Sequence, residues 1–399
     1  MPNIKLMESA LPVAPLKIAA LDSCIDLGKK VNDYIVTFRQ DSLKKYLDSP
    51  LFSTYKQDNY LIDCQCPRFG SGEAKGILGS SIRGKDLFVM VDVCNHSLTY
   101  TVNGHLNHMS PDDHYQDLKR VISAANGKAH RVNVIMPFLY ESRQHKRTKR
   151  ESLDCAFALQ ELVDMGVSNI ITFDAHDPRV QNAIPLNGFE TVRPTYQFDN
   201  FNPPYQFMKA LLRAEPDLKV DKDHLMIVSP DEGAMHRAVY FSNVLGVNMG
   251  MFYKRRDYST IVNGKNPIVA HEFLGDDMHG KNVIVIDDMI SSGESMLDVA
   301  KKMKDRGAER IFVCTTFGLF TDGFEKFDEF YANGYIDRVI TTNLTYLPAE
   351  AYEKPYFVVA DMSKFIALII DSFNHDITMS SVLNPTDKIH RLLERYKNA

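Results

Sequence analysis

Two adjacent carboxylates followed by a hydroxyl-rich loop are the residues of this sequence best suited to chemistry. Asp287 and Asp288 close an apolar run, and the loop Ser291-Ser292-Gly293-Glu294-Ser295 follows shortly after. Backbone N–H groups at the start of a helix, together with serine hydroxyls, suit a phosphate dianion. Two carboxylates accept hydrogen bonds from sugar hydroxyls or hold a hydrated magnesium ion. Asp and Ser are also ordinary helix N-caps, but two aspartates beside this loop favour a site for a phosphorylated sugar.

Four further clusters of ionisable residues follow apolar segments of the chain. They are the basic run 143–150, the acids around His176, the pair Asp231 and Glu232, and the triplet Lys254-Arg255-Arg256. A histidine flanked by acids is a candidate ligand or proton carrier. Clustered cations bind polyphosphate or stabilise developing phosphoryl charge. Each cluster also has a plainer interpretation: a structural histidine, a solvated or nucleic-acid-binding loop, or an exposed turn.

The apolar segments before these clusters predict the buried strands of parallel sheets. We expect strands at 86–91, 132–136, 169–173, 225–228, 283–286 and 310–316, with a short one near 338–340. Helical spacing of apolar residues alternates with them, at 112–125, 152–165 and 296–303. This alternation predicts an α/β fold. In such sheets ligands bind beyond the carboxyl ends of the strands, where the charged clusters lie.

Length and composition narrow the possible classes of protein. A chain of 399 residues is long enough for two domains, and its net charge of −5 with a pI near 6.2 argues against general nucleic-acid binding. Six scattered cysteines, of which only Cys64 and Cys66 are close in sequence, indicate reduced thiols and no zinc site. We find no secretory signal, and the apolar run 365–370 is too short to cross a membrane. We therefore expect a cytoplasmic protein.

Taken together, residues 69–347 resemble the ribose-phosphate pyrophosphokinases, also called phosphoribosyl pyrophosphate synthetases. The most specific matches, in the family's order, are Arg143-Gln144, Phe173-Asp174-Ala175-His176, Ser229-Pro230-Asp231, Lys254-Arg255-Arg256 and Ile286-Asp287-Asp288-Met289-Ile290. The resemblance implies two domains of the type I phosphoribosyltransferase-like fold, each a mostly parallel sheet flanked by helices. It also implies an activity: transfer of the diphosphoryl group of ATP to the 1-hydroxyl of ribose 5-phosphate, with Mg²⁺ as cofactor and AMP as a product.

The resemblance assigns a role to each matching position. Asp287 and Asp288 would hold the ribose hydroxyls and metal, while His176 and Asp231 match magnesium-linked positions near the diphosphoryl group. The residues that would cradle the 5-phosphate are Ser291, Ser292, Gly293 and Ser295. The cations that would stabilise the transition state, along with His176 in the catalytic set, are Lys254 and Arg256. The residues that match ATP-binding positions are Arg143 and Gln144, with Phe69 and Glu73 from an adenine-contacting turn of a neighbouring subunit.

The local composition, in which Pro, Asn and Tyr cluster between 188 and 201, and the resemblance together suggest a division of the chain. We expect an N-terminal accessory segment at 1–60, an ATP-binding domain at 61–190, a ribose-5-phosphate-binding domain at 191–360 and a C-terminal helical segment at 361–399. Family members form dimers stacked into larger rings, so we expect a homo-oligomer, a dimer or a hexamer. We expect ATP and ribose 5-phosphate as its partners, and neither nucleic acid nor membrane.

Three departures from the family's motifs concern the two ligand sites. Ser71 and His145 stand where the family usually has aspartates, at or near the nucleotide. Because a carboxylate accepts from an adenine amino group better than a serine does, we predict weaker discrimination between bases. Glu294 stands where a glycine is usual and adds negative charge beside the phosphate loop, so we expect its side chain to point away.

Other functions share parts of this pattern. A catalytically silent, regulatory relative that assembles with an active synthetase would retain the fold, but the presence of His176, Asp231, Lys254 and Arg256 argues against it. A phosphoribosyltransferase would need the 287–295 segment but not the Lys254 triplet or the basic run. Nucleic-acid binding through 143–150 predicts salt-sensitive affinity, and the net charge disfavours it.

Overall fold

The chain folds into two compact units, and each unit is made of three separate segments of the sequence. The computed structural model describes residues 10–44, 50–125, 127–183, 196–256, 268–380 and 384–397, with the backbone alone at 50–51, 254–256 and 268–271. Unit 1 comprises Met1–Asn202, Asn343–Tyr346 and Asp361–Asn384, and unit 2 comprises Pro203–Thr342, Leu347–Ala360 and Pro385–Ala399. Residues late in the sequence thus complete unit 1.

Unit 1 is built on a five-stranded sheet in the order β1-β4-β7-β8-β9, in which every neighbouring pair is parallel. The strands are β1 (Leu16–Ala20), β4 (Asp86–Met90), β7 (Arg131–Ile135), β8 (Asn169–Phe173) and β9 (Gln197–Phe201). The predicted strands at 86–91, 132–136 and 169–173 are confirmed. β1 lies at the edge of the sheet, so residues 1–60 are not the separate accessory segment that we expected.

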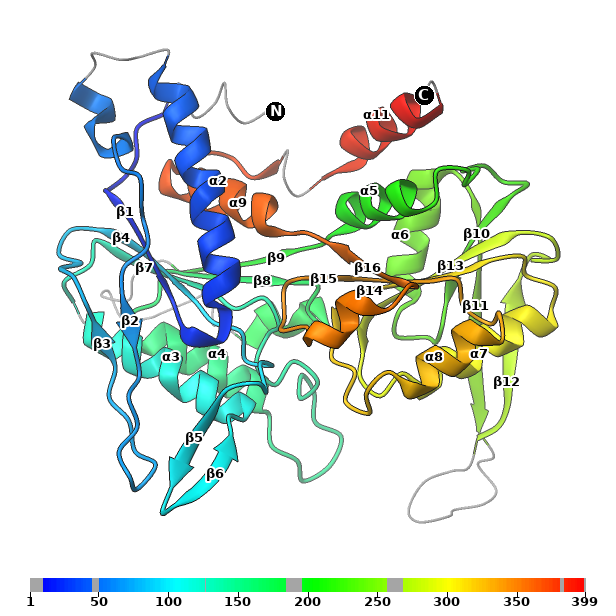
Figure 1. Cartoon of the computed structure of the whole chain (residues 1–399), viewed down its shortest axis with the longest axis horizontal. Helices are drawn as coiled ribbons and strands as arrows, with labels where there is room; N and C mark the ends of the chain where they lie inside the picture. The colour runs from blue at the N-terminus through cyan, green and yellow to red at the C-terminus, as the bar shows by residue number, and fades with distance from the viewer. Residues whose placement is uncertain are drawn as a thin grey trace. The chain divides into compact units, whose positions relative to one another are not determined.

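Helices cover both faces of this sheet (Figure 1). On one face lie α2 (Ile25–Leu43) and α9 (Ser363–Asn374), and on the other lie α3 (Pro111–Ala125) and α4 (Asp154–Asp164). Two small antiparallel sheets join β2 (Cys64–Gln65) to β3 (Ile77–Leu78) and β5 (Thr99–Val102) to β6 (His105–His108). The 3₁₀ turns of this unit are η1 (Asp22–Cys24), η2 (Pro50–Tyr55) and η3 (Pro178–Ala183).

A buried polar network ties α9 to the N-terminal part of unit 1. Arg39 of α2 donates to Asp371 Oδ1 at 2.8 and 3.0 Å and to Asn374 Oδ1 at 2.7 Å. Asn374 in turn donates to Asp86 of β4, which also accepts two bonds from Arg131 of β7. A buried charge that loses its partner typically destabilises a protein by about 3–5 kcal/mol, and Asp371 of α9 is the partner of the buried Arg39. The helix α9 is therefore an integral part of unit 1. The expected segment 361–399 is therefore divided between the two units.

Unit 2 is built on a seven-stranded sheet in the order β12-β11-β10-β13-β14-β15-β16. The strands are β10 (Leu225–Ser229), β11 (Asn248–Arg256), β12 (Ile268–Gly275), β13 (Asn282–Ile290), β14 (Ile311–Gly318), β15 (Arg338–Thr342) and β16 (Phe357–Ala360). All neighbours are parallel except β11 and β12, which are antiparallel. The predicted strands at 225–228, 283–286, 310–316 and 338–340 are confirmed, and β13 continues four residues past its expected end.

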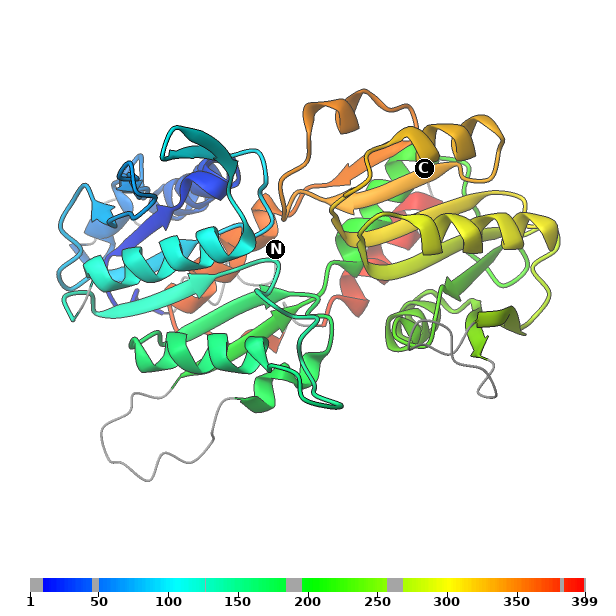
Figure 2. The ribbon, with the colours of Figure 1, turned by 90° about the horizontal axis from the view of Figure 1, so that it is seen from below.

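The apolar run of β13 is continuous because helices cover both faces of the sheet. Successive side chains of a strand point to opposite faces: Val283 and Val285 pack in one core cluster, and Ile284 and Ile286 pack in the other. On the first face lie α7 (Glu294–Asp305) and α8 (Glu325–Ala332), which Figure 2 shows in front of the sheet. On the other face lie α5 (Pro204–Ala214), α6 (Met235–Leu245) and α11 (Thr386–Lys397). The short turn η4 (Ala349–Glu353) precedes β16.

The predicted fold class, α/β with two mostly parallel sheets flanked by helices, is confirmed. Within the described residues, no helix combines the length and apolar character that a membrane span requires.

Candidate active site

Three carboxylates of unit 2 lie at the ends of two neighbouring parallel strands. Asp287 and Asp288 occupy β13 itself, whose ladder with β14 continues to Ile290. Asp231 follows β10, which pairs in parallel with β13. Burial, reinforced by the charges of Asp288 and Asp231, raises the pKa of Asp287 well above its ordinary value. The arrangement concentrates negative charge that a cation or hydroxyl donors would stabilise.

Each of these carboxylates is also fixed by partners within unit 2. Asp287 Oδ1 accepts the backbone N–H of Asp288 at 2.8 Å. Asp231 Oδ1 accepts two N–H groups of the turn that precedes α6, at 2.8 and 3.2 Å. A guanidinium nitrogen of Arg237, on α6, lies 3.9 Å from Asp288 Oδ2, and both side chains are buried. The acids are thus held in position by the fold itself.

The predicted phosphate loop connects β13 to the N-terminus of α7. Gly293 immediately precedes α7 and has φ +88°, a left-handed conformation that glycine adopts without strain. A Cβ at this position would lie 2.4 Å from the ring of Phe327, which is fully buried. Gly293 offers no side-chain cap, and the first N–H of α7, that of Glu294, is 3.5 Å from its acceptor, Ser292 Oγ. The backbone geometry therefore matches that of an anion site at a helix N-terminus.

Glu294, the acid beside this loop, is paired with a cation. Its carboxylate accepts a hydrogen bond from Lys326 of α8, and this bond lowers the pKa of Glu294. The side chains of Glu294 and Lys326 are both largely exposed. This pairing agrees with the expectation that the side chain of Glu294 points away from the loop.

In unit 1, His176 lies in the turn that follows β8. Asp174 begins the turn with φ +40°, a left-handed conformation that is uncommon outside glycine. Two bonds to the end of β9 hold this backbone: Asp174 N–H donates to the Phe201 carbonyl at 2.8 Å, and Ala175 N–H donates to Asn200 Oδ1 at 3.0 Å. Strained backbone that neighbours hold in place is typical of functional sites.

The Arg143-Gln144 turn meets the His176 turn. It follows β7, the parallel neighbour of β8, and it contains Glu141 at φ +54°, whose carbonyl accepts the N–H of Gln144 at 2.8 Å. Arg143 and Gln144 are exposed, whereas His145 turns inward and its ring centroid lies 5.4 Å from that of His176. The structure thus brings together two of the motifs that the sequence placed at strand ends.

The turn with Phe69 and Glu73 packs on the β5–β6 hairpin of unit 1. Phe69 N–H donates to the Glu73 carbonyl at 2.7 Å, and Asn103 of the hairpin donates to the Gly70 carbonyl at 2.9 Å. Ser71 donates its hydroxyl to the Glu73 carboxylate at 2.8 Å. The ring of Phe69 is 52% exposed, and a ring needs an exposed face to stack on a base. The adenine contact itself remains a prediction.

Comparisons with known proteins cover both units. Residues 16–166 match the model of the N-terminal domain of ribose phosphate pyrophosphokinase, and residues 212–332 match the model of the phosphoribosyl transferase domain. The ribose-phosphate pyrophosphokinase of Thermosipho africanus is 27% identical over 266 residues, which is 66% of this chain and 73% of the relative. That of Mycoplasmopsis pulmonis is 25% identical over 319 residues, which is 79% of this chain and 86% of the relative. The chain belongs to the ribose-phosphate pyrophosphokinase family.

The fold of this family member agrees with a solved structure. The phosphoribosylpyrophosphate synthetase of Mycobacterium smegmatis superposes with a TM-score of 0.68 at 19% identity, covering 90% of this chain and 99% of that chain. Both units of this chain therefore share the arrangement of elements found in that synthetase.

The predicted transition-state cations lie at the end of β11. The backbone of Lys254 pairs with that of His271, and Arg256 pairs with Ile268 after an irregularity in the ladder. The side chains of both cations lie outside the described residues, so their roles remain predictions.

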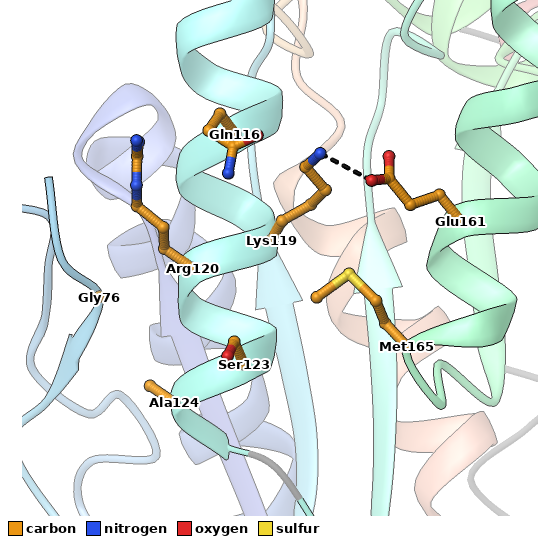
Figure 3. A pocket seen from close by; sticks show the side chains of 8 residues that line it. All are labelled: Gly76, Gln116, Lys119, Arg120, Ser123, Ala124, Glu161 and Met165. Carbon is orange, nitrogen blue, oxygen red and sulfur yellow. Dashed lines mark hydrogen bonds and ion pairs between the residues drawn. The ribbon is translucent and has the colours of Figure 1, made fainter. Parts of the chain in front are cut away.

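The described residues contain no group of three His, Cys, Asp or Glu side chains placed to hold a metal ion. An open depression of ≈ 460 Å³ between α3 and α4 (Figure 3) is lined by none of the predicted site residues. Its cations already have partners, since Lys119 binds Glu161 at 2.8 Å and Arg120 binds Asp117 at 2.6 Å. An anion would have to break these pairs, so we assign the depression no role in the reaction.

Two features of the site could not be predicted from residue type alone. His145 was recognised as a departure from the family pattern, but its contact with His176 was not foreseen. The burial of Arg237 beside Asp288 depends on how α6 packs on the sheet, which residue type does not specify. The available signal was position: His145 follows β7, the neighbour of the strand that leads to His176, and Arg237 follows β10, the neighbour of the strand that carries Asp288.

Proposed function

We propose that this protein is a ribose-phosphate diphosphokinase, which converts ATP and ribose 5-phosphate to 5-phosphoribosyl 1-diphosphate and AMP. The observation that carries the proposal is the loop at the start of α7. Paired acids in β13 lead directly into a left-handed Gly293 and a helix N-terminus, in a chain whose two halves match the domains of this family.

Unit 2 would bind the sugar phosphate. In the proposal, backbone N–H groups of 291–295 and the hydroxyls of Ser291, Ser292 and Ser295 bind the 5-phosphate, which the helix N-terminus favours. Asp287 and Asp288 accept hydrogen bonds from the ribose hydroxyls. Because the fold holds these acids rigidly, the sugar is oriented before reaction, and orientation supplies a large share of catalysis.

Unit 1 would bind the nucleotide. Arg143 and Gln144 project from their turn as exposed side chains, available to a polyphosphate, and Phe69 with Glu73 contact the adenine. His176 meets the diphosphoryl group. Its turn is held by β9 through the two hydrogen bonds described above, which limits its motion during transfer.

The residues present suit a magnesium ion. Mg²⁺ prefers oxygen ligands and is usually held by one or two carboxylates together with substrate phosphates. The clustered carboxylates of unit 2 supply such oxygens, and a site completed by phosphates needs no third protein ligand. Of the two ligands expected from the sequence, Asp231 is one of these carboxylates, and His176 is kept as a prediction from the family resemblance alone. When bound, the ion would neutralise the negative charge of the transferring group.

Cations complete the proposed mechanism. The 1-hydroxyl of the sugar attacks the β-phosphorus of ATP, the bond to the α-phosphate oxygen breaks, and AMP leaves. The negative oxygens of the phosphoryl groups repel the attacking hydroxyl, so positive charge at the transition state accelerates transfer. We assign this charge to Lys254 and Arg256. The homo-oligomer and the cytoplasmic location expected from the sequence also remain proposals.

A product assay tests the activity. The full-length protein is incubated with Mg²⁺, ribose 5-phosphate and ATP, and the products are identified by mass; we expect AMP and 5-phosphoribosyl 1-diphosphate in equal amounts. The double variant Asp287→Asn and Asp288→Asn should lose this reaction, whereas Asp58→Asn, at an exposed aspartate of unit 1, should retain it. Activity only after mixing with an active synthetase would instead identify a regulatory relative. Formation of a nucleotide from a base and 5-phosphoribosyl 1-diphosphate would identify a phosphoribosyltransferase.

A further inference from the structure

His145 contacts two residues of the turn that carries His176. Its ring centroid lies 5.4 Å from that of His176, with the ring planes inclined by 56°. Its Nε2 lies 3.5 Å from Asp177 Oδ2, and the side chains of His145 and Asp177 are each only 11% exposed. The turns after β7 and β8 therefore meet through this imidazole.

Asp177 is a fixed negative charge. Its Oδ1 accepts the backbone N–H and the Nε–H of Arg179, both at 2.9 Å, and Oδ2 accepts a further bond from the same guanidinium. A carboxylate that is ionised and anchored in this way can orient a neighbouring imidazole.

The other ring nitrogen of His145, Nδ1, makes no hydrogen bond within the part of the chain that the structure describes that would account for the position of the ring. Nδ1 is buried, and among the described residues it has no hydrogen-bond partner. An unpaired buried polar atom is unfavourable and calls for a physical explanation. The contacts with Asp177 and His176 supply one, because they hold the ring in an orientation that leaves Nδ1 unpaired.

We propose that His145 is a positioning residue, which uses the anchored charge of Asp177 to fix the ring of His176. This inference rests on the proposed function, in which His176 meets the diphosphoryl group. His145 does not touch the reacting atoms; it acts through His176. The expected cost of losing such a support is about 10- to 100-fold in activity, and it should fall on kcat because the nucleotide still binds through Arg143 and Gln144.

Two measurements test the proposal. In protein labelled with ¹⁵N-histidine, the ring resonances of His176 should shift in both His145→Ala and Asp177→Asn, and should stay in place in His105→Ala, at an exposed histidine of β6. In steady-state assays, His145→Ala should lower kcat by about 10- to 100-fold with little change in the KM for ATP. The double variant His145→Ala and Asp177→Asn should be no slower than His145→Ala alone, since Asp177 acts through His145.

Other outcomes would overturn the inference. If the two substitutions multiply in their effects on kcat, or if the His176 resonances are unchanged in both variants, His145 does not position that ring. Should His145→Ala fail to fold, His145→Phe keeps the ring packing without the contact to the carboxylate, and it is expected to match Asp177→Asn in both measurements. If the unaltered protein releases no AMP, the proposed function fails, while the resonances still decide whether His145 holds His176.

Discussion

Replacing Gly293 with alanine adds one methyl group at the start of the phosphate loop. At φ +88° an L-residue is strained by about 1–2 kcal/mol. The new Cβ would also lie 2.4 Å from the ring of Phe327, which is fully buried and cannot swing aside. Overpacking of this kind costs about 1–3 kcal/mol. We therefore expect Gly293→Ala to lower the free energy of unfolding by about 2–5 kcal/mol in total.

Gly246 provides a matched control. It caps the C-terminal end of α6 with φ +67°, and an added Cβ would meet open space. Gly246→Ala should therefore cost only the backbone strain, about 1–2 kcal/mol. Urea denaturation of the two variants gives the difference, which isolates the contact with Phe327.

The functional effect follows from the same clash. If Phe327 stays in place, the loop backbone must move, and a misplacement of about 1 Å typically costs about 100-fold. We expect this loss in kcat/KM for ribose 5-phosphate, with a smaller change in the KM for ATP and none for Gly246→Ala. Equal destabilisation of both variants would refute the clash with Phe327, and a loss confined to the KM for ATP would refute the assignment of this loop to the sugar phosphate.

Three other predictions follow from the structure and the proposed reaction. Burial raises the pKa of Asp92 from 3.8 to about 7. The folded state therefore binds a proton more tightly than the unfolded state does. The stability that this proton contributes is present at low pH and is lost as the pH rises through 7. Relative to Asp92→Asn, the protein should lose about 2.5 kcal/mol of unfolding free energy between pH 5 and pH 8, measured by denaturation at each pH. Lys254→Ala should lower kcat by about 100-fold or more with ribose 5-phosphate and ATP saturating. GTP should replace ATP more effectively than in relatives with an aspartate at position 71, as rates with each nucleotide would reveal.

Each of these has an outcome that contradicts it. A stability difference between the protein and Asp92→Asn that does not change with pH would show that Asp92 is ionised in the fold at all these pH values. An unchanged kcat in Lys254→Ala would remove that cation from the transition state. Equal strictness for ATP over GTP would show that Ser71 and His145 do not weaken recognition of the base.

Local pattern was sufficient to predict the strands that carry the site. The predicted strand at 169–173 coincides with β8, and 283–286 lies within β13, because a strand covered on both faces is apolar at most of its positions. The edge strands β1 and β9 were missed because polar residues interrupt them, and β16 was missed because it has only four residues. Within the site, the motif positions predicted that Asp231 and Asp287 each lie at the end of a strand, whereas the pairing of these strands, β10 and β13, came from the structure.

The sequence could not predict how distant segments pair. Arg39 and Asp371 are 332 residues apart and form a buried ion pair, yet neither lies in a pattern that indicates a partner. The contact between His145 and His176 likewise depends on the backbone of two turns, including residues with positive φ such as Glu141 and Asp174. Such conformations are set by tertiary structure, and propensity alone does not specify them.

The place of α9 in the chain has a consequence for how the protein is made. On the ribosome, Arg39 emerges long before Asp371, so the pocket for its guanidinium is incomplete until nearly the whole chain has been synthesised. Unit 2, by contrast, has its full sheet by the end of β16 at Ala360. Translation therefore delivers a complete sheet for the second unit before it delivers the last helix of the first. A protein truncated after Asn202 would contain Arg39 without Asp371, the partner of its charge.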